Sequence, residues 1–424
     1  MSAGVQDGVE EAATQRTTRE FTGTAVRGPV TTRYDTIDVL RGLAILAVVL
    51  LHTWIRMYGA GFNAKTLLPP WLGHLLLSNG DNGVTVFFAI SGFLITYTSM
   101  KRFSGLRGLK PRVFYRIRFA RIAPPLLLLL GILSVLHLAH VPGFVIYPSR
   151  GTLAGALFSA LTFHLNWYEG VHGYLPANWD VLWSLSVEEM FYVVFPLACL
   201  LPRVRRGAWV FLAILGALIV AGPFARTIWT AGRPIWQEKT YLGGMDAIAM
   251  GVLTALAAVR LHWYEPPRRF LVGMQALGAL LMALVLVWPR WAWLHPAMHL
   301  LGRSGLDGTI LPMGTCLVML GSVLHGQPGR RVTAPIRWFG RHSYEVYLTH
   351  EFLVIAGTEL YAKYTRGPLL LWFVGILVLT APLGWMLSRF FSEPLNRRLR
   401  GRYGRATGAA IWPGPQRRRP RDSR

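Results

Sequence analysis

Ten segments of this chain are apolar over about the 17–25 residues that a helix needs to cross a bilayer. Hydrophobic residues make up 53% of the sequence and charged residues only 15%. Inside a bilayer the backbone has to satisfy its own hydrogen bonds, which a helix does within one segment. The sequence therefore predicts an all-α, polytopic integral membrane protein of about ten transmembrane helices. The ten segments are 38–57, 82–100, 122–140, 183–201, 208–224, 240–258, 270–288, 310–325, 343–361 and 369–390.

An eleventh apolar segment, 151–167, is ambiguous, and the basic residues decide how it is interpreted. Cytoplasmic loops of membrane proteins carry an excess of Lys and Arg. If only the ten segments cross and both termini are cytoplasmic, 33 of the 44 Lys and Arg lie inside and 10 outside. A crossing at 151–167 would instead place the PRVRRG loop at 202–207 and the arginine-rich C-terminal end outside. We therefore expect 151–167 to form a re-entrant or interfacial helix on the outer face.

Polar segments flank the membrane region at both ends. Residues 1–36 are predicted by the count of basic residues to be a cytoplasmic tail. They lack the apolar core and cleavage site of a signal peptide, so we expect no cleaved signal peptide. Residues 37–391 are the predicted transmembrane domain. Residues 392–424 are rich in Arg, Gly and Pro and are predicted to be a disordered, basic cytoplasmic tail in contact with anionic lipid.

The charge and the cysteines exclude other classes of protein and site. The net charge of +24 would suggest a nucleic-acid partner in a soluble chain, but here the basic residues lie between apolar segments, so topology accounts for them. Cys199 and Cys316 lie inside apolar segments, without a CxxC motif or a cluster with histidine. We expect no nucleic-acid partner, no disulfide and no metal site.

The first predicted span carries an arginine and a histidine at its two ends. Arg41 and His52 are eleven positions apart, which on a helix brings them to within about 20° of the same face, about 16 Å apart along the axis. A polar face of this kind is expected to point into the helix bundle or a wet cavity. Alternatively, His52 is a packed structural histidine and Arg41 reaches the inner headgroups as a topology signal.

Five more ionisable residues are predicted to lie within the membrane, and one of them, Glu351, directly follows His350 near the middle of its span. Glu188 and Glu189 are adjacent and therefore point about 100° apart on a helix, so one is free to face a cavity while the other pairs with a neighbouring helix. Asp246 lies among small residues that permit close helix packing, which also suits a structural hydrogen-bond anchor. His350 lies near the middle of its span.

A basic segment at 101–121 lies on the predicted inner side and ends in three closely spaced arginines. Arg118 and Arg121 are three positions apart, which puts both on one face of a helix, and Arg116 precedes them. Guanidinium groups in this arrangement suit a phosphate-bearing ligand at the cytoplasmic surface. The positive-inside rule alone also predicts basic residues at this position.

Six motifs, in this order, resemble the bacterial acyltransferase-3 family of membrane O-acyltransferases. The motifs are Arg41 with His52, GVTVFFAISGFLI at 83–95, RFAR at 118–121, WSLSVEEMFY at 183–192, DAIAMG at 246–251 and SYEVYLTH at 343–350. The resemblance extends over about residues 34–396. The chain differs at Met190, where a glutamine is common, and at Gly244, where many members have an arginine.

The resemblance implies the transfer of an acyl group, commonly acetyl, from cytoplasmic acyl-CoA to a hydroxyl, usually on a sugar, in a bacterial plasma or inner membrane. It also implies that Arg41 and His52 are essential. Acyl-CoA is then a co-substrate rather than a permanently bound cofactor. The expected partners are membrane lipid, acyl-CoA and a carbohydrate acceptor, and the oligomeric state is left open.

Acyl transfer from a thioester needs a base or nucleophile, and histidine titrates nearest neutral pH. His52 is therefore the expected base, or alternatively a nucleophile that carries the acyl group. Glu188 or Glu189 is expected to orient the imidazole or to bind the acceptor, and the arginines at 116, 118 and 121 to bind the coenzyme phosphates. The expected substrate-binding residues are Trp183, Tyr192, Asp246 and His350.

The acceptor is left open between two kinds of carbohydrate. A cell-surface or lipid-linked carbohydrate is the first expectation, and a glycosylated secondary metabolite such as a macrolide is the alternative. Aromatic residues at 167–183 and 288–295 are placed to stack on a sugar, although interfacial belts have the same composition. A different class, a proton-coupled transporter or flippase of a sugar-containing substrate, would use the same intramembrane charges as a relay.

Overall fold

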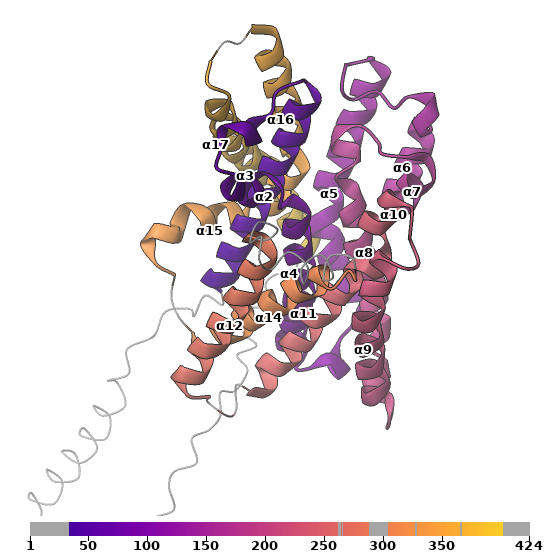
Figure 1. The fold of residues 1–424 in the computed structure, drawn as a ribbon. Coiled ribbons are helices and arrows are strands. Elements are labelled where there is room, and N and C mark those ends of the chain that lie inside the picture. Colours follow the sequence, from indigo (N-terminus) through magenta and orange to yellow (C-terminus); the bar gives the residue numbers. More distant parts are fainter. Residues whose placement is uncertain are drawn as a thin grey trace, which may run out of the picture. The chain divides into compact units, whose positions relative to one another are not determined.

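A computed structural model describes residues 34–261, 264, 266–287, 304–326, 329–364 and 367–401, and these residues are helices joined by turns and loops (Figure 1). The residues up to Tyr34 form a unit separate from Asp35–Arg424, and only the second unit is described below. The aromatic segment at 288–295, residues 1–33 of the predicted tail 1–36 and residues 402–424 of the predicted tail 392–424 lie outside the described residues.

In the described part of the chain, nine helices are long and apolar enough to span a membrane. A tenth, α16, is long enough but more polar, since it carries Glu345, His350 and Glu351. The ten predicted segments all fall on these helices, so the polytopic all-α fold is confirmed. The helices are α2 (Asp35–Gly59), α4 (Gly80–Phe103), α5 (Pro111–Leu138), α8 (Leu182–Ala198), α9 (Gly207–Arg226), α11 (Tyr241–Leu261), α12 (Arg268–Val287), α14 (Asp307–His325), α16 (Ser343–Tyr364) and α17 (Leu369–Leu387).

The ambiguous segment 151–167 is two short helices rather than the single one predicted. Helix α6 covers Leu153–Leu161 and α7 covers Leu165–His172. Between them Phe163 adopts a positive φ of 59°, a left-handed conformation that a continuous helix does not contain. Eight or nine residues extend about 12–14 Å, so neither helix alone crosses a bilayer.

Helix α4 is central to the packing, because α2, α11 and α14 all contact it. The α4–α11 contact is close enough to need glycine on both sides. A Cβ on Gly92 would lie 2.1 Å from the carbonyl oxygen of Ile248, and one on Gly251 would lie 2.1 Å from that of Ala89. The two backbones therefore touch, which is the packing that small residues permit between membrane helices.

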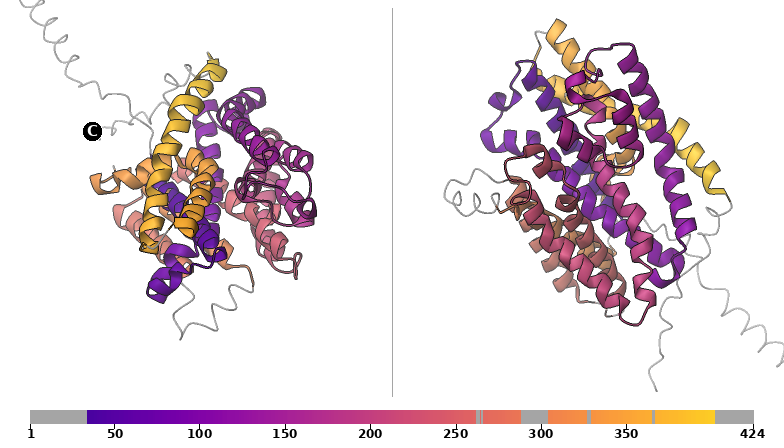
Figure 2. Two further views of the ribbon diagram at one scale, coloured as in Figure 1. Left: turned by 90° about the horizontal axis from the view of Figure 1, so that it is seen from above. Right: turned by 90° about the vertical axis from the view of Figure 1, so that its right-hand side faces the viewer.

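Short helices complete the described fold at its ends. They are α3 (Pro70–Leu77), α10 (Pro234–Lys239), α15 (Ala334–Arg341) and α18 (Glu393–Arg400). Helix α15 packs on α2, and α18, which follows a π-helical turn at Ser388–Ser392, packs on α5. Figure 2 shows this last helix running along the outside of the bundle. The first residues of the segment predicted to be a disordered tail are thus a packed helix.

Candidate functional site

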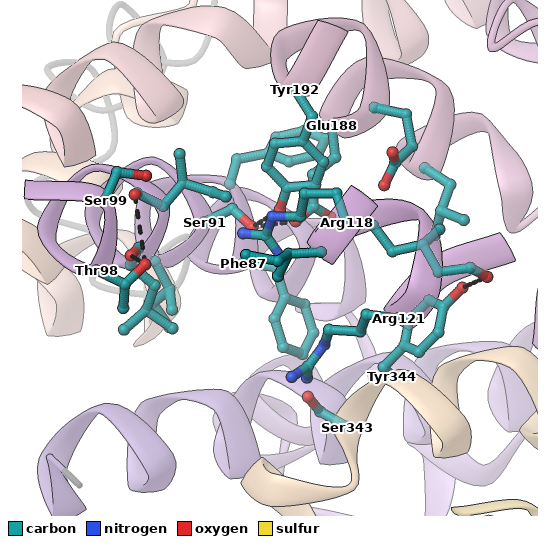
Figure 3. A pocket seen from close by; sticks show the side chains of 18 of the residues that line it. Phe87, Ser91, Thr98, Ser99, Arg118, Arg121, Glu188, Tyr192, Ser343 and Tyr344 are labelled. Carbon is teal, nitrogen blue, oxygen red and sulfur yellow. Dashed lines mark hydrogen bonds between the residues drawn. The ribbon is translucent and has the colours of Figure 1, made fainter. Parts of the chain in front are cut away.

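A cavity of about 370 Å³ lies between α4, α5, α8 and α16 (Figure 3). Its lining on α4 extends from Val84 to Phe103, which is about 28 Å along the helix axis. The Phe103 end is the predicted cytoplasmic end of that helix. The cavity is therefore elongated along α4 and reaches the end of that helix that is predicted to be cytoplasmic.

Five arginines line this cavity. Two of them, Arg118 and Arg121, were predicted as coenzyme ligands, and Arg41 was predicted from the first span. The other two, Arg102 at the end of α4 and Arg400 at the end of α18, were not identified from the sequence. Because they come from four different helices, the positive charge surrounds the cavity rather than lying along one face.

Arg116 does not line the cavity but holds one of its walls. Its side chain is exposed, and its Nε donates to the carbonyl oxygen of Leu399 at 3.2 Å. This hydrogen bond joins α5 to the last turn of α18, the turn that carries Arg400. Arg116 therefore braces the helix that carries Arg400 and is not one of the described residues that line the cavity.

The two adjacent glutamates also line the cavity. Glu188 accepts hydrogen bonds from Ser91 and Tyr192, and the Arg118 guanidinium lies 4.4 Å from the centre of the Tyr192 ring. These groups converge in Figure 3. Glu189 is 7% exposed and lines the same cavity. Tyr192, Glu188 and Arg118 therefore form one polar wall, which also explains how charged groups are accommodated at that depth.

Arg41 and His52 do share one helix face, as predicted, and that face contacts α16. The Arg41 Nη2 atom donates to the Ser343 hydroxyl at 2.8 Å, and His52 Nδ1 lies 2.8 Å from His350 Nε2. Ser343 and His350 are seven positions apart on α16, two turns of helix, so they too share a face. Two polar stripes therefore meet between α2 and α16.

The carboxylate that contacts His52 is Glu351, and the expectation that Glu188 or Glu189 orients the imidazole is wrong. Glu351 Oε1 lies 2.8 Å from His52 Nδ1, and Glu351 Oε2 lies 3.6 Å from Arg56 Nε. The reason is tertiary: α16 packs directly on α2, whereas α8 faces α4 and α5.

The hydrogen bonds assign the proton on each ring. His350 Nδ1 lies 2.8 Å from the carbonyl oxygen of Tyr347, and a carbonyl only accepts, so this nitrogen carries the proton. In neutral His350 the other nitrogen, Nε2, is then an acceptor, and His52 Nδ1 donates to it and to Glu351. In neutral His52 the lone pair is then on Nε2, for which the described part of the chain shows no hydrogen-bond partner, and this is the form required of a base or nucleophile.

His52, His350 and Glu351 also have the composition of a three-ligand metal site. Two imidazole nitrogens on one tetrahedral zinc ion lie about 3.3 Å apart, since each Zn–N bond is about 2.0–2.1 Å long. The two ring nitrogens here are 2.8 Å apart, which is the separation of a hydrogen bond. The distance therefore fits a hydrogen bond between the two imidazole rings better than joint coordination of one metal ion.

Asp246 lies in an ion pair away from the cavity lining. Arg226 Nη2 donates to its Oδ2 at 2.9 Å, and the Thr309 hydroxyl donates to the same oxygen at 2.8 Å. Asp246 is fully buried. The Arg226 guanidinium comes from α9 and pairs with Asp246. Position 244, two residues before Asp246, is a glycine in this chain. The contacts fit the structural-anchor alternative more closely than substrate contact.

A second buried ionic cluster lies around Lys239, next to Trp183. Lys239 Nζ lies 2.9 Å from Glu169 Oε2, contacts Asp180, and lies 5.8 Å from the centre of the Trp183 ring. Burial, followed by the Asp180 charge, raises the pKa of Glu169, and the Lys239 ammonium opposes this rise. Trp183 packs edge-on against Phe88, 6.2 Å between ring centres, and so lies behind the cavity wall.

The family model described as an acyltransferase domain matches residues 34–389. The chain belongs to this acyltransferase family. It is similar to the peptidoglycan O-acetyltransferase OatA of Listeria monocytogenes serovar 1/2a, with 23% identity over 76% of this chain and 50% of that protein. It is also similar to the O-acetyltransferase OatA of Staphylococcus aureus (strain NCTC 8325), with 23% identity over 85% of this chain and 57% of that protein.

A putative O-acetyltransferase of Staphylococcus aureus (strain COL) is 22% identical over 85% of this chain and 57% of its own length. The chain thus spans about half the length of the curated relatives it matches. No solved structure matches it significantly. Together with the long apolar helices, the family match identifies a multi-pass membrane acyltransferase.

Proposed function

We propose that this protein transfers an acetyl group from cytoplasmic acyl-CoA to a hydroxyl of a carbohydrate at the outer face of the membrane. The observation that carries the proposal is the position of His52 Nδ1, 2.8 Å from both His350 Nε2 and Glu351 Oε1, which in the neutral ring assigns the proton to Nδ1 and leaves the lone pair on Nε2. The two relatives named OatA are O-acetyltransferases by name, which agrees with this reaction.

The arginine-lined cavity supports acyl-CoA as the donor. CoA carries three phosphate groups on its nucleotide half, and guanidinium groups bind phosphates through charge-assisted hydrogen bonds. Arg102, Arg118, Arg121 and Arg400 line the inner part of the cavity and would hold the nucleotide. The pantetheine arm would then extend along α4 toward Arg41 and the level of His52.

In the proposed reaction the acceptor hydroxyl oxygen attacks the thioester carbonyl carbon while His52 Nε2 takes the hydroxyl proton. The Glu351 carboxylate, beside His52 Nδ1, stabilises the imidazolium that forms. Collapse of the tetrahedral intermediate breaks the C–S bond, and His52 returns the proton to the departing CoA thiolate. The products are the acetyl ester and free CoA, and the base is regenerated.

The acceptor is proposed to be a cell-surface or lipid-linked carbohydrate. One relative is named for peptidoglycan, so cell-wall glycan is the first substrate to test. A glycosylated secondary metabolite is the second. The termini are proposed to be cytoplasmic because the positive-inside count requires it.

The decisive experiment uses purified protein in proteoliposomes with labelled acetyl-CoA and cell-envelope glycans. Wild type is expected to release CoA and to form alkali-labile acetyl esters only when glycan is present. His52→Ala should lower the rate by about 10²–10⁴, whereas His172→Ala, an exposed histidine on α7, should not. An acyl group trapped on His52 and detected by mass spectrometry would identify the nucleophilic route.

The same preparation tests the alternative that the protein is a transporter or flippase. Movement of a labelled glycan across the vesicle membrane without release of CoA would support a transporter or flippase and would refute the proposed reaction.

A further inference from the structure

The inner cavity stops before the level of the histidine pair. Among the described residues, those that line it include Tyr347 and Ser184 but not His52, His350 or Glu351. Tyr347 is three positions before His350 on α16, and their ring centres are 5.8 Å apart. The His350 ring is in turn stacked on His52, with 5.0 Å between centres. The Tyr347 side chain is thus the layer between the cavity and the histidine pair.

The Tyr347 ring is held across this end of the cavity by hydrogen bonds to α8. Its hydroxyl donates to the carbonyl oxygen of Val181 at 2.7 Å and forms a hydrogen bond with the Ser184 hydroxyl at 2.6 Å. Tyr347 is 7% exposed and Ser184 is 6% exposed. These bonds join α16 to the N-terminal end of α8, so the ring bridges the two helices.

We propose that Tyr347 is the barrier that separates the donor cavity from His52, and that it determines which acyl chains reach the histidine. A group bound in the cavity contacts His52 only when the Tyr347 side chain turns and gives up its bonds to Ser184 and Val181. A short acyl group needs the smallest displacement of the ring, and each added methylene needs a larger one. The choice of acyl-CoA as the ligand rests on the proposed function, but the barrier itself does not.

Another tyrosine of the same cavity provides a matched control. Tyr344 is one turn before Tyr347 on α16 and also lines the cavity, but its hydroxyl donates to the carbonyl oxygen of Ile122 on α5 at 3.0 Å. Figure 3 shows it beside Arg121, on the arginine-bearing part of the wall. Truncation of Tyr344 enlarges the cavity without opening the path to His52.

The barrier is tested without any acyl donor by thiol labelling. His52→Cys is made in a chain whose two buried cysteines, Cys199 and Cys316, are replaced by alanine. A small membrane-impermeant thiosulfonate is added to vesicles that expose the cytoplasmic face. Adding Tyr347→Ala should raise the labelling rate at least tenfold, and adding Tyr344→Ala should not change it.

Two further variants keep this test valid if Tyr347→Ala fails to fold. Tyr347→Phe and Ser184→Ala retain the ring but remove hydrogen bonds that hold it, so each should give a smaller increase in labelling. Equal labelling rates with and without the Tyr347 ring, in folded protein, would overturn the proposal.

The proposed effect of Tyr347 on the choice of acyl-chain length is tested by steady-state kinetics. An extra methylene in a fitted pocket changes kcat/KM by about 10–200-fold. We therefore expect Tyr347→Ala to raise the ratio of kcat/KM for butyryl-CoA over acetyl-CoA at least tenfold, and Tyr344→Ala to leave that ratio unchanged. An unchanged ratio in Tyr347→Ala would refute the specificity role. A wild-type protein that turns over no acyl-CoA would refute acyl-CoA as the donor. The labelling experiment would still decide whether Tyr347 is a barrier between the cavity and His52.

Discussion

Replacing Glu351 by glutamine isolates the role of its charge. Glutamine has the same size and retains an oxygen that accepts the hydrogen from His52 Nδ1. The tautomer of His52 is therefore preserved, together with the contact to His350. What is lost is the negative charge 2.8 Å from His52 Nδ1, which stabilises the imidazolium only after the proton has been transferred.

The size of the effect follows from the distance and the burial. Both side chains are largely buried, with 18% of His52 and 5% of Glu351 exposed. Two unit charges about 4 Å apart interact by about 4 kcal/mol at an effective dielectric constant of about 20. A loss of that size raises the barrier enough to slow the reaction about 10³-fold. Because the imidazolium forms only during the reaction, the loss should appear in kcat rather than in KM.

The assay is acetyl transfer from labelled acetyl-CoA in proteoliposomes at equal amounts of folded protein. Glu359→Gln is the matched control, because Glu359 lies on the same helix but is exposed. We expect Glu351→Gln to lower kcat about 10³-fold with an unchanged KM for acetyl-CoA, and the control to retain wild-type kinetics. A kcat within threefold of wild type in Glu351→Gln would refute the assignment of Glu351 as the partner of a catalytic histidine.

Three other perturbations test the remaining parts of the site. Arg400→Ala should raise the KM for acetyl-CoA about tenfold with little change in kcat, since one charge-assisted hydrogen bond contributes about 1.5–3 kcal/mol. The control is Arg397→Ala, whose side chain pairs with Glu393 one turn before it. An equal rise in KM in this control would contradict a specific contact between Arg400 and a phosphate. Arg226→Ala should destabilise the fold by about 3–5 kcal/mol, because it leaves the buried Asp246 charge unpaired. Thermal unfolding in detergent measures this loss, and adding Asp246→Asn should recover part of it. An unchanged unfolding midpoint in Arg226→Ala would contradict the role of Asp246 as a structural anchor. Dialysis against a strong chelator should leave acetyl transfer intact, and activity that falls and returns only with added zinc would show that the histidine pair shares a metal ion.

The helices and most of the intramembrane polar residues were predictable because the bilayer imposes simple rules. The length of apolar segments locates the spans, and the ten predicted segments each coincide with a helix. Helical periodicity placed Arg41 and His52 on one face, which the contacts to Ser343 and His350 confirm. Both inferences concern a single helix, where sequence spacing and spatial position are directly related.

The partners of these residues were not predictable, since they depend on which helices pack together. The sequence contains several intramembrane carboxylates, and nothing in their spacing identifies Glu351 rather than Glu188 as the neighbour of His52. Glu351 was placed near mid-membrane from the sequence, but its contact with His52 was not predicted. Arg400 was not identified, because it lies in a stretch whose composition resembles a disordered tail.

The sequence by itself determined the membrane class, the positions of the long apolar helices, the face that carries Arg41 and His52, and the family. Only the tertiary structure decided which carboxylate contacts His52, that Arg226 pairs with Asp246, and that Tyr347 separates the cavity from the histidine pair. The physical reason is that backbone hydrogen bonding and the hydrophobic effect act within each segment, whereas contacts between helices depend on side-chain shapes in segments up to about 300 positions apart, as between His52 and His350.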